Sequence, residues 1–132
     1  MSAAAELYID RRPGYFGRAR TDIELVLPEI TASVLELGCG DGGTLRWLRG
    51  IRQVDDAMGI ELVADAARQA RDVFDEVVAG NIETMDLDLP PARFDLILAL
   101  DVLEHLVDPW RVIARCHQAL KPGGAMLASI SN

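Results

Sequence analysis

Short apolar runs alternate with mixed, helix-like segments along most of this 132-residue chain. The apolar runs predict strands over residues 34–37, 56–61, 76–79, 94–100 and 125–130. The segments between them predict helices over 43–49, 63–73 and 109–120, the last with Asp108 as its cap and Pro109 at its first position. Because strands alternate with helices and the strands are apolar on both faces, we expect one α/β domain. Its five strands should form a doubly wound, mostly parallel, Rossmann-like sheet with helices on both faces.

Turn and cap signals account for the remaining segments. Residues 1–20 have no clean period and contain one proline and two glycines, which indicates an irregular arm. Thr21 to Glu24 has the sequence of a capping box and predicts a helix start at Thr21. The double proline at 90–91 predicts a loop. Residues 121–124, Lys-Pro-Gly-Gly, predict a turn that ends the last helix before the final strand.

A glycine-rich turn follows the first predicted strand. Gly38, Gly40 and Gly42 occupy alternate positions, and a predicted helix begins directly after them. Such a turn leaves backbone N–H groups facing one crevice, and glycine permits both a positive φ and a close approach of a ligand. Gly38, Gly40 and Gly43 also match the spacing of dinucleotide sites, which keeps an NAD-type oxidoreductase as an alternative. Glu36 favours a cationic or amino-bearing ligand instead, because its carboxylate would repel a pyrophosphate.

Composition and charge narrow the expected partners. The net charge of −8 argues against a nucleic-acid backbone as the partner. No apolar run approaches the ~20 residues that span a bilayer, and no signal-peptide pattern is evident. The two cysteines, Cys39 and Cys116, form neither a disulfide framework nor a metal site. We therefore expect a cytoplasmic protein that binds neither nucleic acid nor membrane.

Five segments carry a family resemblance. Glu36-x-Gly38-x-Gly40-x-Gly42 resembles the first motif of the class I S-adenosylmethionine-dependent methyltransferases. Segments 59–62, 79–83, 94–105 and 120–124 resemble further motifs of that family, in the expected order and spacing. The resemblance covers nearly the whole chain and is of the small-molecule type seen in methyltransferase type 11 and 12 domains. It implies transfer of a methyl group from S-adenosylmethionine to a small-molecule acceptor, with S-adenosylhomocysteine as the product.

The resemblance also implies a donor site. It places Glu36, Gly38, Cys39, Gly40 and Gly42 at the donor. Glu61 would accept hydrogen bonds from the ribose diol, and Leu62 would lie against the adenine. Asn81 stands where the family commonly has an acid; its amide oxygen can still accept from the adenine amino group, next to the backbone N–H of Ile82. The alternatives are a solvated strand-end carboxylate for Glu61 and a turn residue for Asn81.

The end of the fourth predicted strand supplies the candidate catalytic residues. Leu100 and Asp101 lie there beside the first strand, at the switch point of strand order, and Asp101 would face the methionine part or the acceptor. His105 is the candidate general base for an oxygen acceptor. A packed histidine is the alternative, and proximity alone can carry much of a methyl transfer. Glu104 and His105 do not make a metal site by themselves.

Both ends of the chain also resemble the family in part. Tyr15 and Arg20 resemble its lid, with Tyr15 covering the ligand and Arg20 pairing with the methionine carboxylate. The resemblance thus makes residues 1–132 one donor-binding domain with a lid at 1–20, and it implies that the family's C-terminal strands are absent. The acceptor site would then be incomplete, so a donor-binding module without its own acceptor site is a further alternative. The absence of these C-terminal strands would also leave residues 125–130 at a sheet edge, which predicts self-association through that strand.

Overall fold

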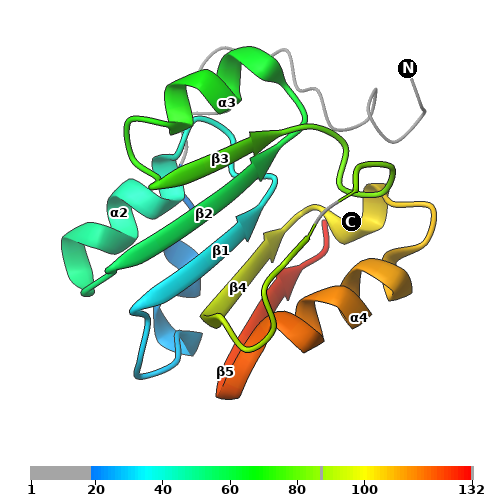
Figure 1. Cartoon of the computed structure of the whole chain (residues 1–132). Coiled ribbons are helices and arrows are strands. Elements are labelled where there is room, and N and C mark those ends of the chain that lie inside the picture. Colours follow the sequence, from blue (N-terminus) through cyan, green and yellow to red (C-terminus); the bar gives the residue numbers. More distant parts are fainter. Residues whose placement is uncertain (1–18, 87, 132) are drawn as a thin grey trace.

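The computed structural model describes residues 19–86 and 88–131. Its five strands form one parallel sheet in the order β3-β2-β1-β4-β5 (Figure 1). The strands are β1 (Ser33–Leu37), β2 (Asp56–Glu61), β3 (Glu76–Ala79), β4 (Phe94–Leu100) and β5 (Leu120–Ser129). The helices are α2 (Gly43–Ile51), α3 (Ala64–Ala70) and α4 (Pro109–Ala119), with 3-10 turns η1 (Thr21–Val26) and η2 (Leu103–His105). The predicted doubly wound α/β fold is confirmed, including the pairing of β4 with β1.

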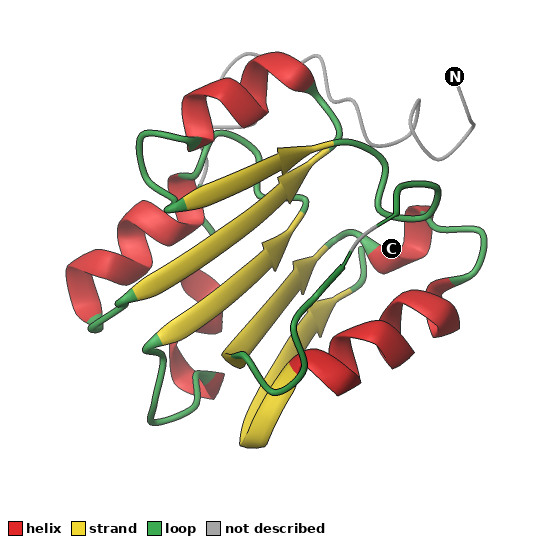
Figure 2. Cartoon of the chain, in the orientation of Figure 1, coloured by secondary structure: helices red, strands yellow, loops and turns green. Residues whose placement is uncertain are grey.

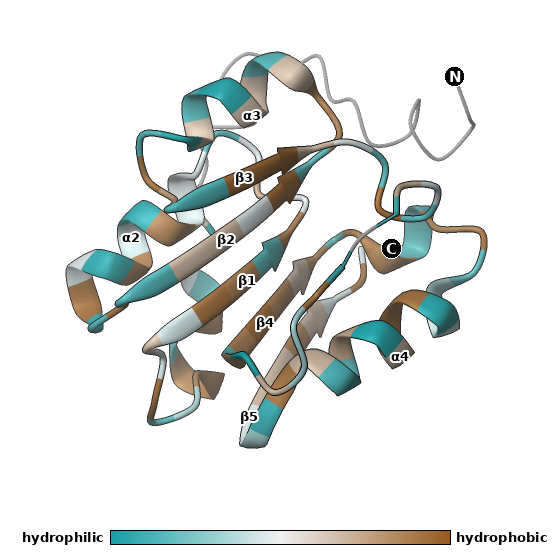
Figure 3. Cartoon of the chain, in the orientation of Figure 1, coloured by the Kyte–Doolittle hydropathy of each residue, from teal (hydrophilic) through white to brown (hydrophobic). Residues whose placement is uncertain are grey.

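Two apolar layers, one on each face of the sheet, hold the helices in place (Figures 2 and 3). One layer packs the sheet against η1, α2 and α3 through Ile23, Leu45, Leu48 and Ala67. The other packs it against η2 and α4 through Leu103, Val112, Cys116 and Ala119. β1 is buried along its whole length because both of its faces are covered. None of the helices within the described residues is long and apolar enough to cross a membrane.

The start of the first helix differs from the sequence prediction. A helical turn does begin at Thr21, but it is the 3-10 turn η1, and the residue that precedes it is Arg20. No side chain caps its N-terminus, so the predicted capping box is not formed. The Thr44 hydroxyl accepts the backbone N–H of Arg20 at 3.0 Å, and Ile23 is buried. The long-range contact to α2 therefore replaces the local cap.

The beginning of β5 also differs from the prediction. The strand begins at Leu120, opposite Phe94, and after a register shift the pairing resumes with Ala125 opposite Leu96. The predicted Lys-Pro-Gly-Gly turn is thus an irregular segment inside β5, with Gly123 at φ +82°. A Cβ on Gly124 would lie 3.0 Å from the carbonyl oxygen of Phe94, so glycine permits this close approach to β4.

The predicted helix boundaries vary in accuracy. α2 extends to Ile51, beyond the predicted end, and α3 is shorter than predicted at both ends. α4 begins at Pro109 as predicted, because the side chain of Asp108 accepts the backbone N–H of Arg111 at 3.3 Å. That helix ends at Ala119, one residue before the predicted end.

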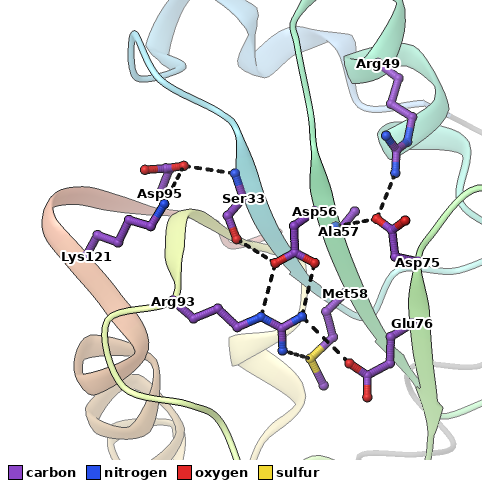
Figure 4. Close-up of polar contacts among 10 residues, drawn as sticks. All are labelled: Ser33, Arg49, Asp56, Ala57, Met58, Asp75, Glu76, Arg93, Asp95 and Lys121. Atoms are coloured by element: carbon purple, nitrogen blue, oxygen red, sulfur yellow. Dashed lines mark hydrogen bonds and ion pairs between the residues drawn. The ribbon is translucent and has the colours of Figure 1, made fainter.

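A polar network joins the amino-terminal ends of the five described strands, with Glu76 of β3 3.8 Å from Arg93 (Figure 4). Arg93 donates from Nε and Nη2 to the two carboxylate oxygens of Asp56, both at 3.2 Å. Asp56 also accepts the Ser33 hydroxyl at 3.0 Å, and Asp95 accepts the Ser33 backbone N–H at 2.9 Å and Lys121 Nζ at 3.4 Å. The hydrogen bonds from Arg93 are the largest cause of the lowered pKa of Asp56. The network stabilises the sheet at the end opposite the glycine turn.

Candidate functional site

The glycine turn between β1 and α2 adopts the left-handed backbone conformation that the sequence indicated. Gly38, Gly40 and Gly42 have φ values of +67°, +58° and +95°. The backbone N–H groups of Gly38 and Cys39 donate to the carbonyl oxygen of Ile60 at 2.8 and 3.1 Å, which ties the turn to β2. Side chains at these three positions would strain the backbone. The turn therefore requires glycine for its conformation, apart from any ligand.

Glu61, at the end of β2, holds the glycine turn. Its side chain is completely buried. One carboxylate oxygen accepts the backbone N–H of Gly40 and the other accepts that of Val63, both at 2.8 Å. Sequence reasoning gave Glu61 a contact with the ribose, and that contact stays a prediction. The bond to Gly40 was not foreseen, because it depends on the exact apposition of two strands.

Glu36 supplies a second buried carboxyl group in β1. It is 4% exposed, and within the described part of the chain its Oε1 atom has no hydrogen-bond partner. Burial raises the pKa of Glu36 well above its ordinary value, the neighbouring Glu61 raises it further, and Arg20 acts in the opposite direction. An unpartnered buried carboxyl oxygen is costly, so this position favours a ligand that brings a hydrogen-bond donor or a positive charge.

The structure pairs Arg20 with Asp101, two residues that the sequence assigned to the donor separately. Arg20 Nη1 lies 2.9 Å from Asp101 Oδ2, and the same guanidinium holds both oxygens of Asp22 at 3.0 Å. Asp101 has a φ of +57°, and its Oδ1 atom accepts the Ser129 hydroxyl at 2.9 Å. A ligand carboxylate at Arg20 would therefore have to exchange with an existing partner. Tyr15, the predicted lid residue, lies outside the described residues.

A cleft opens at the carboxyl ends of the strands. Its volume is about 450 Å³ with its open mouth. Five residues predicted from the sequence line it, namely Gly38, Leu62, Asn81, Ile82 and His105, and the other lining residues are Ile60, Gly80, Glu83, Val102 and Leu106. The other predicted residues that the structure describes do not line it, and these are Arg20, Glu36, Cys39, Gly40, Gly42, Glu61, Leu100 and Asp101. Most of them hold or flank the turn behind the cleft.

Cys39 and Leu100 belong to the packed interior beside the turn. A Cβ on Gly59 would lie 2.7 Å from Cys39 Sγ, so this thiol packs against β2. Burial is the largest cause of the raised pKa of Cys39, which keeps the thiol protonated. Leu100 is partly buried against the apolar layer on the α2 face. Their direct contact with a donor stays a prediction.

The loop after β3 contains Asn81 and also Glu83, a residue to which the sequence analysis gave no role. Asn81 Oδ1 accepts the backbone N–H of Glu83 at 2.9 Å, so Asn81 does act as a turn residue, and its contact with adenine stays a prediction. The Glu83 carboxylate accepts the backbone N–H groups of Val107 and Asp108 at 3.0 and 2.8 Å. These partners lie 24 and 25 residues further along the chain, beyond any local sequence signal.

His105 lies in η2 and lines the cleft, where its backbone N–H donates to Val102 at 3.0 Å. The other histidine, His117, is exposed on α4. The neighbouring Glu104 accepts both the backbone N–H and the hydroxyl of Ser131, at 2.8 and 2.6 Å. Burial is the largest single influence on the pKa of Glu104 and raises it, but the bonds from Ser131 and smaller effects lower it, and the net pKa is below its ordinary value. No group of three or more metal-ligating side chains suited to a metal ion is found among the described residues.

Comparisons with known proteins agree with this arrangement. A family model described as "Methyltransferase domain" matches residues 35–128. The chain is 35% identical over 107 residues to a ubiquinone biosynthesis O-methyltransferase from Idiomarina loihiensis. It is 33% identical over 99 residues to the 27-O-demethylrifamycin SV methyltransferase of Amycolatopsis mediterranei. A solved S-adenosylmethionine-dependent methyltransferase from Mesorhizobium loti superposes with a TM-score of 0.72 at 27% identity.

These matches cover most of this chain but only part of each relative. They span 75% of the chain and 42% of the Idiomarina protein, and 70% of the chain and 36% of the Amycolatopsis protein. The Mesorhizobium structure covers 83% of the chain, which corresponds to 51% of its own length. The family model alone matches well over half of the residues. This chain therefore belongs to the methyltransferase domain family.

Proposed function

We propose that this chain is the donor-binding domain of an S-adenosylmethionine-dependent methyltransferase that methylates a hydroxyl group of a small molecule. One observation carries the proposal: the glycine turn, held by the buried Glu61, borders a cleft lined by Asn81, Ile82 and His105. The names of two relatives support a small-molecule hydroxyl acceptor. One is a ubiquinone biosynthesis O-methyltransferase, and the other is the 27-O-demethylrifamycin SV methyltransferase.

The charges around the turn fit a donor with positive groups. Glu36 and Glu61 are buried near one another, and Glu36 Oε1 is without a partner in the described part of the chain. The sulfonium and ammonium groups of S-adenosylmethionine suit such carboxyl groups, whereas a pyrophosphate would be repelled. The family membership likewise leaves the NAD-type oxidoreductase without support. Arg20 would take the donor carboxylate by exchanging its bond to Asp101.

The cleft fits the nucleoside part of the donor. Leu62 and Ile82 provide apolar walls for the adenine. Asn81 Oδ1 already accepts one hydrogen bond and retains a lone pair for the adenine amino group. Glu61 would accept a ribose hydroxyl in addition to the backbone N–H groups of Gly40 and Val63.

The bound donor and the residues of the chain would contribute different parts of the reaction. When bound, the donor supplies a methyl group activated by a positively charged sulfur. The residues of the chain bind and orient the reactants, which by itself supplies much of the rate. His105 would accept the proton from the acceptor hydroxyl. Asp101 is less suited to this role, because Arg20 and Ser129 already hold its carboxylate.

A melting experiment tests this function. S-adenosylhomocysteine at saturating concentration should raise the melting temperature, because a ligand that binds only the folded state stabilises it, and NADH should not. Stabilisation by NADH alone would overturn the proposal. Donor binding with no methyl transfer to any member of a broad hydroxyl panel would favour the donor-binding module instead.

A further inference from the structure

The two walls of the cleft come from segments that lie far apart in the sequence. One wall is the loop after β3, with Asn81 and Ile82, and the other is the turn after β4, with His105 and Leu106. Glu83 joins them. Its carboxylate oxygens accept the backbone N–H groups of the two residues that follow the β4 turn, at 3.0 and 2.8 Å. Within the described residues, this is a direct polar connection between the two walls.

A continuous path of hydrogen bonds runs through Glu83. Its backbone N–H donates to Asn81 Oδ1 at 2.9 Å, and its side chain accepts from Val107 and Asp108. Asn81 faces the cleft, and Asp108 is the cap of α4. A ligand that contacts Asn81 therefore acts on the same path that fixes the opposite wall.

The turn that carries His105 depends on its two ends. It is a single 3-10 turn, in which the backbone N–H groups of His105 and Leu106 donate to Val102 and Leu103 at 3.0 and 3.2 Å. Such short turns have weak internal hydrogen bonds. β4 fixes the turn at its beginning, and the bonds from Val107 and Asp108 to Glu83 fix it at its end.

The charges around Glu83 favour its position. The carboxylate lies at the N-terminus of the 11-residue helix α4, where the helix dipole stabilises a negative charge. Arg111 and Arg115 line the adjoining hollow of about 250 Å³ together with Glu83 and Asp108. These cations lie beside the two carboxylates and offset part of their negative charge.

We propose that Glu83 is a positioning residue that joins the two walls of the cleft and holds the His105 turn in place for methyl transfer. The inference rests on the proposed function for the reaction, but the connection itself exists in the free protein. Loss of the Glu83 carboxylate should loosen the turn and weaken the binding of S-adenosylhomocysteine, because the ligand must then order one wall of its own cleft.

Two variants and a control test this role. Glu83→Ala removes the acceptor, and Glu83→Gln keeps the shape but turns an amide NH₂ group toward one of the two backbone N–H donors. Glu29→Ala is the control, because Glu29 is an exposed carboxylate outside the cleft lining. Hydrogen exchange of the free proteins reports on the backbone amides of His105 and Leu106. The chain has two histidines, so ring signals of His105 can be compared with those of His117 as an internal reference during titration with S-adenosylhomocysteine.

We expect exchange at His105 and Leu106 to accelerate by about tenfold in both Glu83 variants, with S-adenosylhomocysteine affinity about tenfold weaker. The ligand-induced shift of His105 should shrink, while His117 and the Glu29→Ala control should remain as in the unmodified protein. Unchanged exchange at His105 and Leu106 in both Glu83 variants would overturn the proposal. Failure of the unmodified protein to bind S-adenosylhomocysteine would contradict the proposed function, and the exchange comparison would still decide the role of Glu83.

Discussion

The buried carboxylate of Glu61 accepts the backbone N–H of Gly40 at 2.8 Å, so the end of β2 directly holds the glycine turn that follows β1. Its second oxygen accepts the Val63 backbone N–H at the same distance. This residue therefore has a structural task in the free protein in addition to any contact with a ribose. The two tasks are compatible, because each carboxylate oxygen has more than one lone pair.

Glu61→Gln should separate the charge of this residue from its shape. The amide would place an N–H group against the backbone N–H of Gly40 or Val63, with no room to turn outward. We expect the free energy of unfolding to fall by about 1–3 kcal/mol and S-adenosylhomocysteine affinity to fall as well. Urea unfolding and calorimetry measure the two effects, with the exposed Glu29→Gln as the control. Equal stability of Glu61→Gln and the unmodified protein would show that the pair of backbone bonds to Gly40 and Val63 does not need the carboxylate.

Glu36 should make the stability of the protein depend on pH. Its pKa is raised well above 4.5 in the folded state, chiefly by burial, so the folded state retains a proton that the unfolded state has released. Stability should therefore fall as the pH rises above about 4.5 and toward the folded-state pKa. Glu36→Gln should remove this slope and gain stability over the unmodified protein as the pH rises. Urea unfolding from pH 5 to 8 checks this, and parallel curves for the two proteins would contradict it.

The Arg93–Asp56 pair should stabilise the fold without affecting the cleft, because it lies at the opposite end of the strands (Figure 4). Arg93→Ala should cost about 1 kcal/mol near neutral pH, a modest figure since the Asp56 side chain is 39% exposed. Because Arg93 lowers the pKa of Asp56, that loss should shrink as the pH falls below 3.8.

The control for this experiment is Arg68→Ala, whose ion pair with Asp65 is largely exposed and should contribute little. Calorimetry with S-adenosylhomocysteine should give the same affinity for the unmodified protein, Arg93→Ala and Arg68→Ala. A large loss of affinity in Arg93→Ala alone would show that the network reaches the cleft.

β5 lies at the edge of the sheet, as the sequence predicted, and it pairs with β4 alone among the described strands. We expect self-association through this edge, because among the described residues no second strand pairs with this almost uncharged strand. Leu127 and Ser129 are half-buried, so the suitable site for a charge is the exposed Ala128. Ala128→Lys should reduce association in light scattering, whereas Ala114→Lys, on the exposed side of α4, should not. A monomer at every concentration would contradict this prediction.

Local patterns predicted most of the fold. The apolar runs located all five strands, and Asp108 with Pro109 located the start of α4, because these signals depend on neighbours in the sequence. The capping box at Thr21 failed because Arg20 finds a tertiary partner in Thr44. The beginning of β5 was missed because glycine and proline indicate a turn, whereas the pairing of Leu120 with Phe94 depends on the sheet.

The candidate site was predictable in its residues and less so in their contacts. The positive φ values of the glycine turn followed from the motif itself. The bonds from the Gly40 N–H to Glu61 and from the Val107 N–H to Glu83 could not be predicted from the motif, since they join residues 21 and 24 positions apart. The pairing of Arg20 with Asp101, 81 residues apart, likewise depends on the folded chain. Spacing identifies which side chains reach the edge of the sheet, and only packing decides which of them meet.

Calorimetry of S-adenosylmethionine binding tests the central claim most directly. The account predicts a dissociation constant on the order of micromolar for the unmodified protein. It also predicts no binding to Gly40→Val, because φ is +58° at this position and a branched side chain would both strain the turn and block the ligand. Circular dichroism would establish that the variant is folded. No heat with the unmodified protein up to millimolar ligand, or full affinity in the folded Gly40→Val variant, would contradict the claim that this turn holds the methyl donor.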